Sequence, residues 1–220
     1  MRRIPCYSCG EEYAQIALHW NGQKCSFPDF TDKQMELMKG LLLGDADIKS
    51  GVNGSIFRLR MTNKKFLHWV NSKLSPLSRG VFLSETSEQQ KESALRGGLS
   101  GVSNESEFNK LYGLRTVTHP KVDELLDWYS TGEKRYPDHL TEEMLKMWYV
   151  TDGHKNPFGI RFTCNSQLDS REQVLKMLES IDYINDTSFN DDGTITVSCK
   201  DSKLFWERTN PPPGFEYKWG

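Results

Sequence analysis

Two short stretches of the 220-residue chain decide the fold: MKGLLLGDA at residues 38–46 and LKMWYVTDG at residues 145–153. Within them, LLLGDA and WYVTDG align without a gap. Each stretch is the apolar end of an expected helix and runs into a turn that carries one carboxylate, Asp45 in the first and Asp152 in the second. The order helix, acidic turn, strand, helix, strand follows twice, which indicates a weak repeat of about 105 residues.

Each carboxylate stands where the helix dipole is unfavourable, because the C-terminal end of a helix is partly negative. A bound divalent cation reverses that sign, and Mg²⁺ takes carboxylate and carbonyl oxygens such as those of Gly44 and Thr151. Gly40 and Gly44 leave one helix face nearly bare, so a partner helix can approach and bring the two acids together. Paired carboxylates with metal suit phosphodiester hydrolysis. The alternative is two ordinary surface turns, for which Asp-Ala and Asp-Gly are common signals.

The remaining elements are predicted from periodicity and from turn residues. Thr31 or Asp32 caps the first motif helix, which ends near residues 44–47. The other expected helices cover residues 65–74, 122–129, 141–150, 169–179 and 202–208. The expected strands cover residues 55–62, 80–83, 112–118, 159–163, 184–189 and 194–198. Residues 84–110 are poor in apolar side chains and are predicted to form a long mobile loop.

Positive charge is concentrated in one window although the formal net charge is −2 and the sequence pI is about 6.2. Taken whole, that balance argues weakly against a nucleic-acid-binding protein. Residues 48–84 nevertheless contain no acid and seven basic side chains: Lys49, Arg58, Arg60, Lys64, Lys65, Lys73 and Arg79. Alternation places Arg58, Arg60 and Thr62 on one strand face, and Arg161 with Thr163 on another. The two interpretations are a basic DNA-binding face and an ordinary solvated strand and helix.

Composition places the chain among globular proteins, with 36% hydrophobic and 26% charged residues. The longest apolar run, MWYV at residues 147–150, is far below the ~20 residues that span a bilayer. The N-terminus has no apolar region typical of a secretory signal. We therefore expect a soluble intracellular protein, cytoplasmic or nucleoid-associated, whose cysteines are reduced or metal-bound.

The first 27 residues contain the spacing Cys6-x2-Cys9-x9-His19-x5-Cys25. Four such ligands within 20 residues favour a tetrahedral structural Zn²⁺ site, and so short a segment needs such a staple to fold. The alternative is three free thiols and a packed His19. An HNH nuclease motif at His19 and Asn21 lacks its expected second cysteine pair. The remaining cysteines, Cys164 and Cys199, are interpreted as core or sheet residues.

The two opening stretches resemble the paired motifs of single-chain LAGLIDADG homing endonucleases. The segment LRTVTHP at residues 114–120 and the pair Tyr217-Lys218 are similar to further features of that family. The resemblance covers about residues 31–220. Met147 and Thr151 depart from the small residues of the strict motif, and Leu43 stands where the namesake motif has Asp.

The resemblance implies an α+β fold with two pseudo-symmetric αββαββα halves that form a saddle over DNA, with the motif helices between them. It divides the chain into a zinc-stapled module at residues 1–27, a first half at 28–135 and a second half at 136–220. The last acid of each motif binds the catalytic Mg²⁺ or another divalent cation, which maps to Asp45 and Asp152, with the Gly44 and Thr151 carbonyls as further ligands. Asn63 and Asn165 correspond to polar residues that order water near the metals, and Arg115 to a basic residue near the scissile phosphate.

These considerations predict a monomeric, site-specific DNA endonuclease that recognises an asymmetric double-stranded target. The expected DNA-binding residues are Lys49, Arg58, Arg60, Asn63, Lys64, Lys65, Arg115, Arg161, Thr163 and Asn165. The alternatives are an RNA-splicing maturase or a DNA-binding regulator on the same fold, neither of which needs both acids. A zinc-stapled interaction module without nucleic acid would leave the basic window unexplained.

Overall fold

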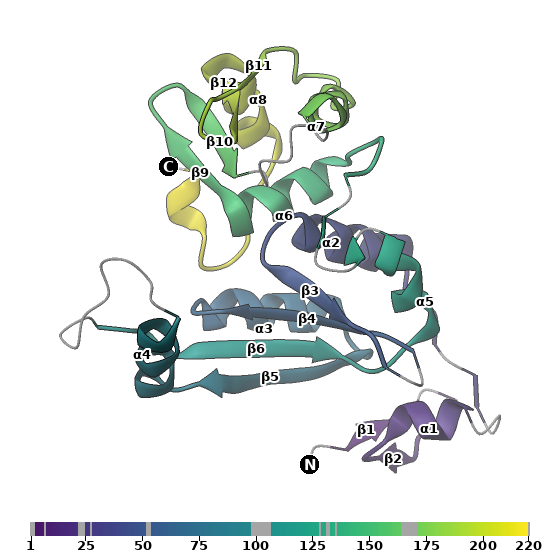
Figure 1. Cartoon of the computed structure of the whole chain (residues 1–220). Helices are drawn as coiled ribbons and strands as arrows, with labels where there is room; N and C mark the ends of the chain where they lie inside the picture. Colours follow the sequence, from purple (N-terminus) through teal and green to yellow (C-terminus); the bar gives the residue numbers. More distant parts are fainter. Residues whose placement is uncertain are drawn as a thin grey trace.

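Two halves of the chain repeat one order of helices and strands (Figure 1). The computed structural model describes residues 3–6, 8–21, 25–26, 28–51, 54–97, 107–127, 129–130, 133–134, 136–163 and 171–219. The first half contains α2 (Asp32–Leu43), β3 (Ala46–Lys49), β4 (Ile56–Met61), α3 (Lys64–Lys73), β5 (Ser78–Glu85), α4 (Ser87–Arg96), β6 (Leu111–Thr116) and α5 (Pro120–Asp123). The second half contains α6 (Glu142–Asp152), β9 (Gly153–Asn156), β10 (Gly159–Thr163), α7 (Arg171–Glu179), β11 (Thr187–Phe189), β12 (Thr194–Ser198) and α8 (Cys199–Arg208).

Each half is built on an antiparallel sheet of four strands with the same topology. The strand order is β3-β4-β6-β5 in the first sheet and β9-β10-β12-β11 in the second. The predicted α+β fold with two αββαββα halves is therefore confirmed, with α4 as an addition between β5 and β6. Among the described residues, none of the helices combines the length and the apolar character that crossing a membrane requires.

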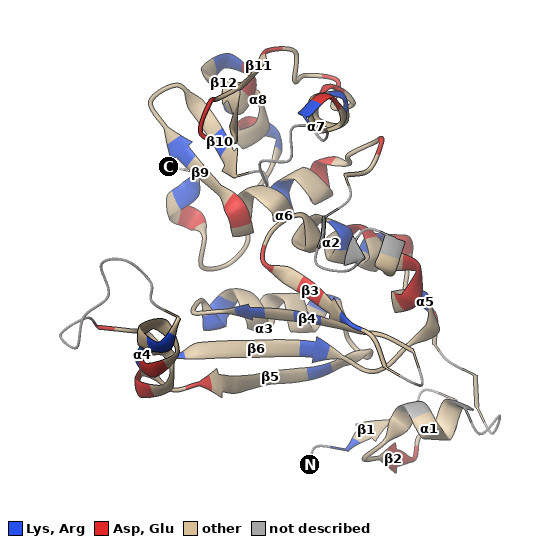
Figure 2. Ribbon diagram, in the orientation of Figure 1, with Lys and Arg blue, Asp and Glu red and all other residues tan. Residues whose placement is uncertain are grey.

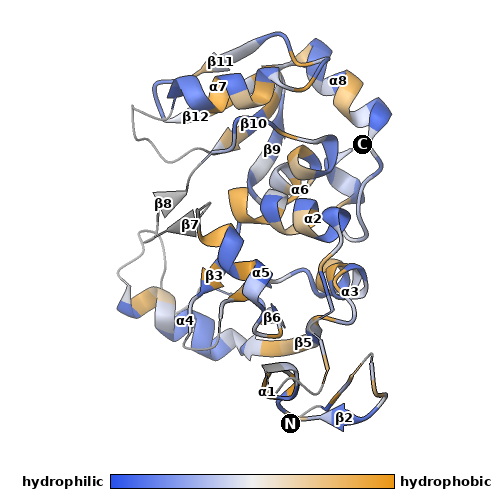
Figure 3. Cartoon of the chain, turned by 90° about the vertical axis from the view of Figure 1, so that its right-hand side faces the viewer, coloured by the Kyte–Doolittle hydropathy of each residue, from blue (hydrophilic) through white to orange (hydrophobic). Residues whose placement is uncertain are grey.

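The helices α2 and α6 begin at side-chain caps and lie side by side between the halves (Figures 1 and 3). Thr31 and Gln34 form a reciprocal capping box at the start of α2, and the Thr141 hydroxyl accepts from the Met144 backbone N–H at the start of α6. A Cβ atom added to Gly40 would lie 2.6 Å from the Met144 carbonyl oxygen. The bare face predicted for the first helix is thus the face on which α6 packs.

The two motif helices also connect the two hydrophobic cores. Met147 and Val150 of α6 belong to the core of the first half, whereas Leu43 of α2 belongs to the core of the second. Burial of apolar side chains is the main favourable contribution to folding. Each helix therefore stabilises both halves, and the halves are held together by core packing.

Residues 87–96 differ from the sequence prediction, because they form the helix α4 where a mobile loop was expected. Thr86 and Gln89 make a second capping box, although Ala94 is the one buried residue that the helix contributes. The strands β3 and β9, which follow the two acidic turns, were not predicted. Each has only four residues and follows its motif directly, so the pattern does not separate it from the turn.

The N-terminal module comprises β1 (Ile4–Pro5), β2 (Glu12–Tyr13) and α1 (Ile16–Asn21), and it packs against the first half. Ile4, Cys6, Ile16 and Trp20 belong to the same hydrophobic core as α2 and β4. The linker after the module is held at His119, whose Nε2 lies 2.9 Å from the Pro28 carbonyl oxygen. The predicted module therefore shares its core with the half that follows it.

Four further short elements belong to the described residues. They are the 3-10 helix η1 (Glu124–Asp127), the strand pair β7 (Tyr129–Ser130) and β8 (Glu133–Lys134), and the 3-10 helix η3 (Glu216–Lys218) near the C-terminus. Phe215 lies in the core of the first half, and Trp219 packs against both cores. The C-terminal segment therefore returns from α8 to the junction between the halves.

Candidate metal centres and nucleic-acid interface

The ends of α2 and α6 meet at the residues that carry the motif acids. A Cβ atom on Gly44 would lie 3.4 Å from the Cβ of Asp152 and would overlap the side chain of Thr151. Asp45, the next residue, is exposed, and Asp152 is half-buried. The absence of a side chain at Gly44 thus allows the two helix ends to touch and brings the two acidic turns together.

Lys218 is anchored at the end of α6, which carries Asp152. Its Nζ donates to the carbonyl oxygens of Tyr149 at 3.1 Å, Val150 at 2.8 Å and Gly153 at 2.6 Å. Burial lowers the pKa of Lys218 to about 8, and the charges of Asp45 and Asp152 oppose that shift. Both carboxylates therefore act on the same ammonium group.

The donor set at this junction fits a hard divalent cation. It supplies two carboxylates from two helix ends, and Mg²⁺ is commonly held by one or two carboxylates with further oxygen ligands. None of the three carbonyls that Lys218 engages belongs to Thr151. The Thr151 carbonyl oxygen was predicted, with that of Gly44, as a further metal ligand. A lysine ammonium beside the acids adds a positive charge that can face a phosphate.

Predicted basic residues lie along β3, β4 and β6 of the first sheet (Figure 2). In β4, Phe57 and Leu59 are fully buried in the core, whereas Arg58 and Arg60 alternate with them on the opposite face. Strand register places Arg58 opposite Arg115 of β6. Arg115 is exposed and its guanidinium lies 5.5 Å from the ring centroid of Phe82. Alternation therefore identified the solvent face of this sheet.

Acidic side chains accompany three of the predicted DNA-binding arginines. Arg58 Nε lies 2.6 Å from Asp47 Oδ1, Arg60 Nη1 lies 3.9 Å from Glu85 Oε1, and Arg161 Nη1 lies 3.6 Å from Asp192 Oδ2. In Asp192, hydrogen bonds from the Thr194 hydroxyl and backbone N–H lower the pKa of the carboxyl group, and the charge of Arg161 adds to that effect. Sequence reasoning assigned these acids no role, because their contacts depend on strand register.

Two of the predicted residues are engaged in contacts with the C-terminal segment. Asn63 Oδ1 accepts from the Phe66 N–H at the start of α3, and its Nδ2 donates to the Gly214 carbonyl oxygen at 2.7 Å. Lys65 Nζ lies 3.0 Å from Glu216 Oε1. These bonds join the first half to the C-terminal segment, and a role of Asn63 in ordering water near the metals stays a prediction.

Three further predicted residues, Lys49, Lys64 and Thr163, are exposed. Lys49 and Thr163 are exposed on β3 and β10, and exposed Lys64 has its Nζ 5.2 Å from the ring centroid of Tyr112. Asn165 and Cys164 lie outside the described residues. Cys199 is exposed as the first residue of α8, so its interpretation as a core or sheet residue is wrong.

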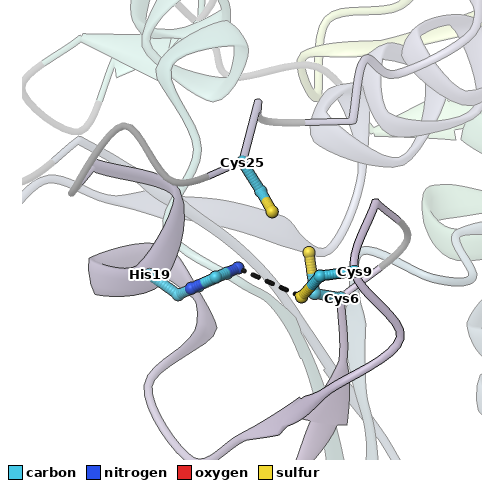
Figure 4. Close-up of side chains that lie close together, drawn as sticks. All are labelled: Cys6, Cys9, His19 and Cys25. Atoms are coloured by element: carbon cyan, nitrogen blue, oxygen red, sulfur yellow. Dashed lines mark hydrogen bonds between the residues drawn. The ribbon is translucent and has the colours of Figure 1, made fainter.

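The four ligands predicted for zinc converge in the N-terminal module (Figure 4). The ligand atoms of Cys6, Cys9, His19 and Cys25 all lie within 4.8 Å of one another, and Cys9 Sγ is 3.6 Å from His19 Nε2. Zn–S bonds of about 2.3 Å and Zn–N bonds of about 2.0 Å place neighbouring ligand atoms of a tetrahedral site about 3.5 Å apart. Within the described residues, these four side chains form the one group of three or more Cys, His, Asp or Glu side chains that lie close enough together to hold a metal ion.

Contacts around the His19 ring and around the Cys6 thiol favour metal binding by this cluster. The His19 ring stacks on Tyr13 with centroids 3.9 Å apart, and Tyr13 Oη donates to Glu11 Oε2 at 2.6 Å, which orients the imidazole. Burial alone would raise the pKa of Cys6, but hydrogen bonds from the backbone N–H groups of Cys9 and Ser8 lower the pKa to about 6. The thiolate that a metal requires is therefore favoured at Cys6.

Comparison with known proteins concerns the family and the fold of the chain. Residues 35–197 match the LAGLIDADG DNA endonuclease family. A solved structure described as "The homing endonuclease I-WcaI bound to its DNA recognition sequence" is similar, with a TM-score of 0.69 and 17% sequence identity over 94% of this chain and 93% of that chain. No curated protein matches the sequence. The structural likeness concerns the fold, and the match over residues 35–197 includes both motif acids.

Proposed function

Because the chain belongs to the LAGLIDADG DNA endonuclease family, we propose that it is a homing endonuclease that hydrolyses both strands of a specific DNA site. The observation that carries this proposal is the contact between the two helix ends that bear Asp45 and Asp152, whose charges both act on Lys218. A protein that only binds nucleic acid has no need of two acids at that place, and this disfavours a maturase or a regulator without cleavage.

In this proposal, Asp45 and Asp152 hold the divalent cation, Mg²⁺ in the simplest case, with the Gly44 and Thr151 carbonyls as further ligands. A bound cation of this kind activates water for attack on phosphorus and stabilises the leaving oxygen. The chain itself positions the phosphate between the acids, and the Lys218 ammonium offsets the charge that develops there. Tyr149 fixes the backbone of Lys218, since its Oη donates to the Lys218 carbonyl oxygen at 2.8 Å.

Double-stranded DNA is the proposed partner, and the outer faces of the two sheets are the proposed contact surface. Arg58, Arg60, Arg115 and Arg161 then contact base edges or flanking phosphates. Both motif helices come from one chain and pack on each other, so a single copy supplies a complete site. We therefore propose a monomer that works in a compartment that holds DNA.

The N-terminal cluster is proposed to bind one structural Zn²⁺ through Cys6, Cys9, His19 and Cys25. The fit rests on four converging soft or borderline ligands and on the orientation of His19 by Tyr13. The purified chain is then expected to contain one tightly bound zinc ion, measured by elemental analysis.

The decisive experiment is cleavage selection on a randomised duplex library with Mg²⁺. The proposal predicts discrete double-strand products at a defined site. If the full chain binds duplex DNA in the same assay and no discrete product forms, the fold serves binding without cleavage and the proposal is overturned.

A further inference from the structure

We propose that Asp47 determines the base preference of the first sheet by holding Arg58 in the orientation in which its guanidinium reads guanine. This inference rests on the proposed function, because it requires this sheet to face DNA. Asp47 lies on β3 and Arg58 on β4, and strand register places the two residues directly opposite each other. Opposite residues on one face of an antiparallel pair have adjacent side chains. The result is a bond of 2.6 Å from Arg58 Nε to Asp47 Oδ1.

The atoms used in this bond leave the arginine able to read a base. A guanidinium carries five N–H donors in one plane, and the bond to Asp47 uses the donor on Nε. Bidentate recognition of guanine needs two adjacent donors for O6 and N7, which the terminal groups Nη1 and Nη2 provide. Fixing Nε also fixes the guanidinium plane before DNA arrives, so less side-chain freedom is lost on binding.

The neighbour of Arg58 on its other side, on β6, explains why an acid is needed on β3. Across the next strand pair, Arg58 faces Arg115. Like charges directly opposite each other repel, and two unpaired arginines would splay toward phosphates. Asp47 draws Arg58 toward β3 and neutralises one of the two charges. Its carboxylate also repels phosphate, so the arginine is directed at a base edge.

Asp47 differs from the other acids beside DNA-facing arginines. Glu85 lies 3.9 Å from Arg60 and Asp192 lies 3.6 Å from Arg161, both beyond hydrogen-bond distance. The side chain of Asp47 is 23% exposed, against 29% for Glu85 and 57% for Asp192. The closest and least exposed acid is therefore the one that holds its arginine, and Glu85 provides a matched control.

The test measures binding of the full chain, without divalent metal, to its selected target and to every single-base substitution of that target. The variants are Arg58→Ala, Asp47→Ala, Asp47→Asn and Glu85→Gln. The wild type should prefer guanine at one base pair by roughly 5- to 150-fold, and Arg58→Ala should lose that preference. Asp47→Ala should lose most of it at the same base pair. Asp47→Asn should keep part of it, because the amide oxygen still accepts from Nε, and should bind all sequences more tightly.

Three outcomes separate this inference from the function on which it rests. If Arg58→Ala changes no base preference, the first sheet does not face DNA, and the proposed orientation on DNA fails with the inference. Suppose that Arg58→Ala loses the guanine preference at one base pair, while both Asp47 variants keep that preference and unfold at the wild-type temperature. The inference alone is then overturned. It is also overturned if Asp47→Asn abolishes cleavage with base preference intact, since Asp47 then belongs to the metal site. Glu85→Gln should leave the position read by Arg58 unchanged.

Discussion

At the scale of single residues, the proposed function makes cleavage depend on the side chains of Asp45 and Asp152. Replacing either by Asn keeps the shape of the side chain and removes the charge that holds a cation. We expect Asp45→Asn and Asp152→Asn each to abolish double-strand cleavage in Mg²⁺, while the Kd for duplex DNA changes less than about tenfold. Gel assays of cleavage and binding on one target check both parts. Full cleavage by either variant would contradict the assignment.

His119 is a second residue with a testable property, because its neutral form joins the N-terminal linker to the first half. Its Nδ1 accepts from the Lys121 backbone N–H at 3.0 Å, and Nε2 lies 2.9 Å from the Pro28 carbonyl oxygen. Burial lowers the pKa of His119, so the folded state binds its proton less readily than the unfolded state. The stability that neutral His119 contributes is therefore present above about pH 6.5 and is lost as the pH falls below it.

We expect the difference in unfolding free energy between the wild type and His119→Gln to shrink between pH 7.5 and pH 5.5. Urea unfolding of both proteins at the two pH values measures it. If zinc is bound as proposed, its release at the lower pH would affect both proteins alike and would not produce the expected change. The exposed His139, replaced by Gln, is the control for the substitution itself. A constant difference for His119→Gln would contradict this role.

At the scale of elements, the contact between α2 and α6 depends on Gly40. A methyl group there would lie 2.6 Å from the Met144 carbonyl oxygen and 2.8 Å from the Met147 Cβ, so the backbone of α6 must move. Overpacking of this kind costs about 1–3 kcal/mol and outweighs the ~1 kcal/mol by which Ala favours a helix over Gly. Gly40→Ala should therefore lower the free energy of unfolding in a denaturant titration.

Gly97 is the matched control for that substitution. It ends α4 with φ −73°, and a Cβ atom there would lie 3.3 Å from the Ser93 carbonyl of its own helix. Gly97→Ala should leave stability within about 0.5 kcal/mol or increase it. Equal losses at Gly40 and Gly97 would show that the helix contact is not the cause.

How far the sequence predicts these elements depends on whether their signal is local. The motif helices are evident from apolar spacing, the first also from a cap at Thr31 or Asp32, and β10 is found at its predicted residues. The helix α4 was missed because its signal is the Thr86–Gln89 capping box, with little apolar spacing. The partners of the arginines were beyond reach, because Asp47 opposes Arg58 only through a strand, β3, that the pattern does not separate from its turn.

The candidate site likewise has residues that a local sequence signal identifies and contacts that no local signal identifies. The two motif acids stood out by their repeated motif, and the Cys/His cluster that the structure brings together stood out by its spacing. The three carbonyl bonds of Lys218 depend on a chain reversal after α8 that no periodicity encodes. The resemblance pointed to Tyr217 and Lys218, and the structure adds that the charges of both Asp45 and Asp152 act on the Lys218 ammonium.

At the scale of the whole molecule, zinc is expected to stabilise the first half as well as the module, because the two share one core. Cys9→Ser removes an exposed ligand and should lose the zinc and lower the Tm by about 4–8 °C, which corresponds to ~2 kcal/mol for a chain of this size. Calorimetry with elemental analysis measures both. Cys199→Ser, at an exposed thiol outside the cluster, should change neither. A zinc-free Cys9→Ser protein with the wild-type Tm would show that the metal does not stabilise the half.

The two sheet faces differ in charge, and this difference predicts an asymmetric DNA target site. The first face carries Lys49, Arg58, Arg60 and Arg115, whereas the second carries Arg161 and Thr163 among the described residues that were predicted to bind DNA. Arginine contacts to guanine discriminate by about 1–3 kcal/mol each, so most of the discrimination should arise on the first face. The natural site should therefore be asymmetric, and its two halves should contribute unequally.

Two palindromic duplexes, each built from one half of the selected target, test this asymmetry. In each palindrome one half of the protein meets its own sequence and the other half meets a foreign one. We expect both to bind more weakly than the natural site, and the palindrome of the half-site read by the first sheet to bind more tightly than the other. Titrations at two salt concentrations separate this difference from phosphate contacts, which weaken equally for all three duplexes as salt rises. A palindrome bound as tightly as the natural site would mean that the two faces read DNA alike, and the difference in charge between the sheets would then have no part in recognition.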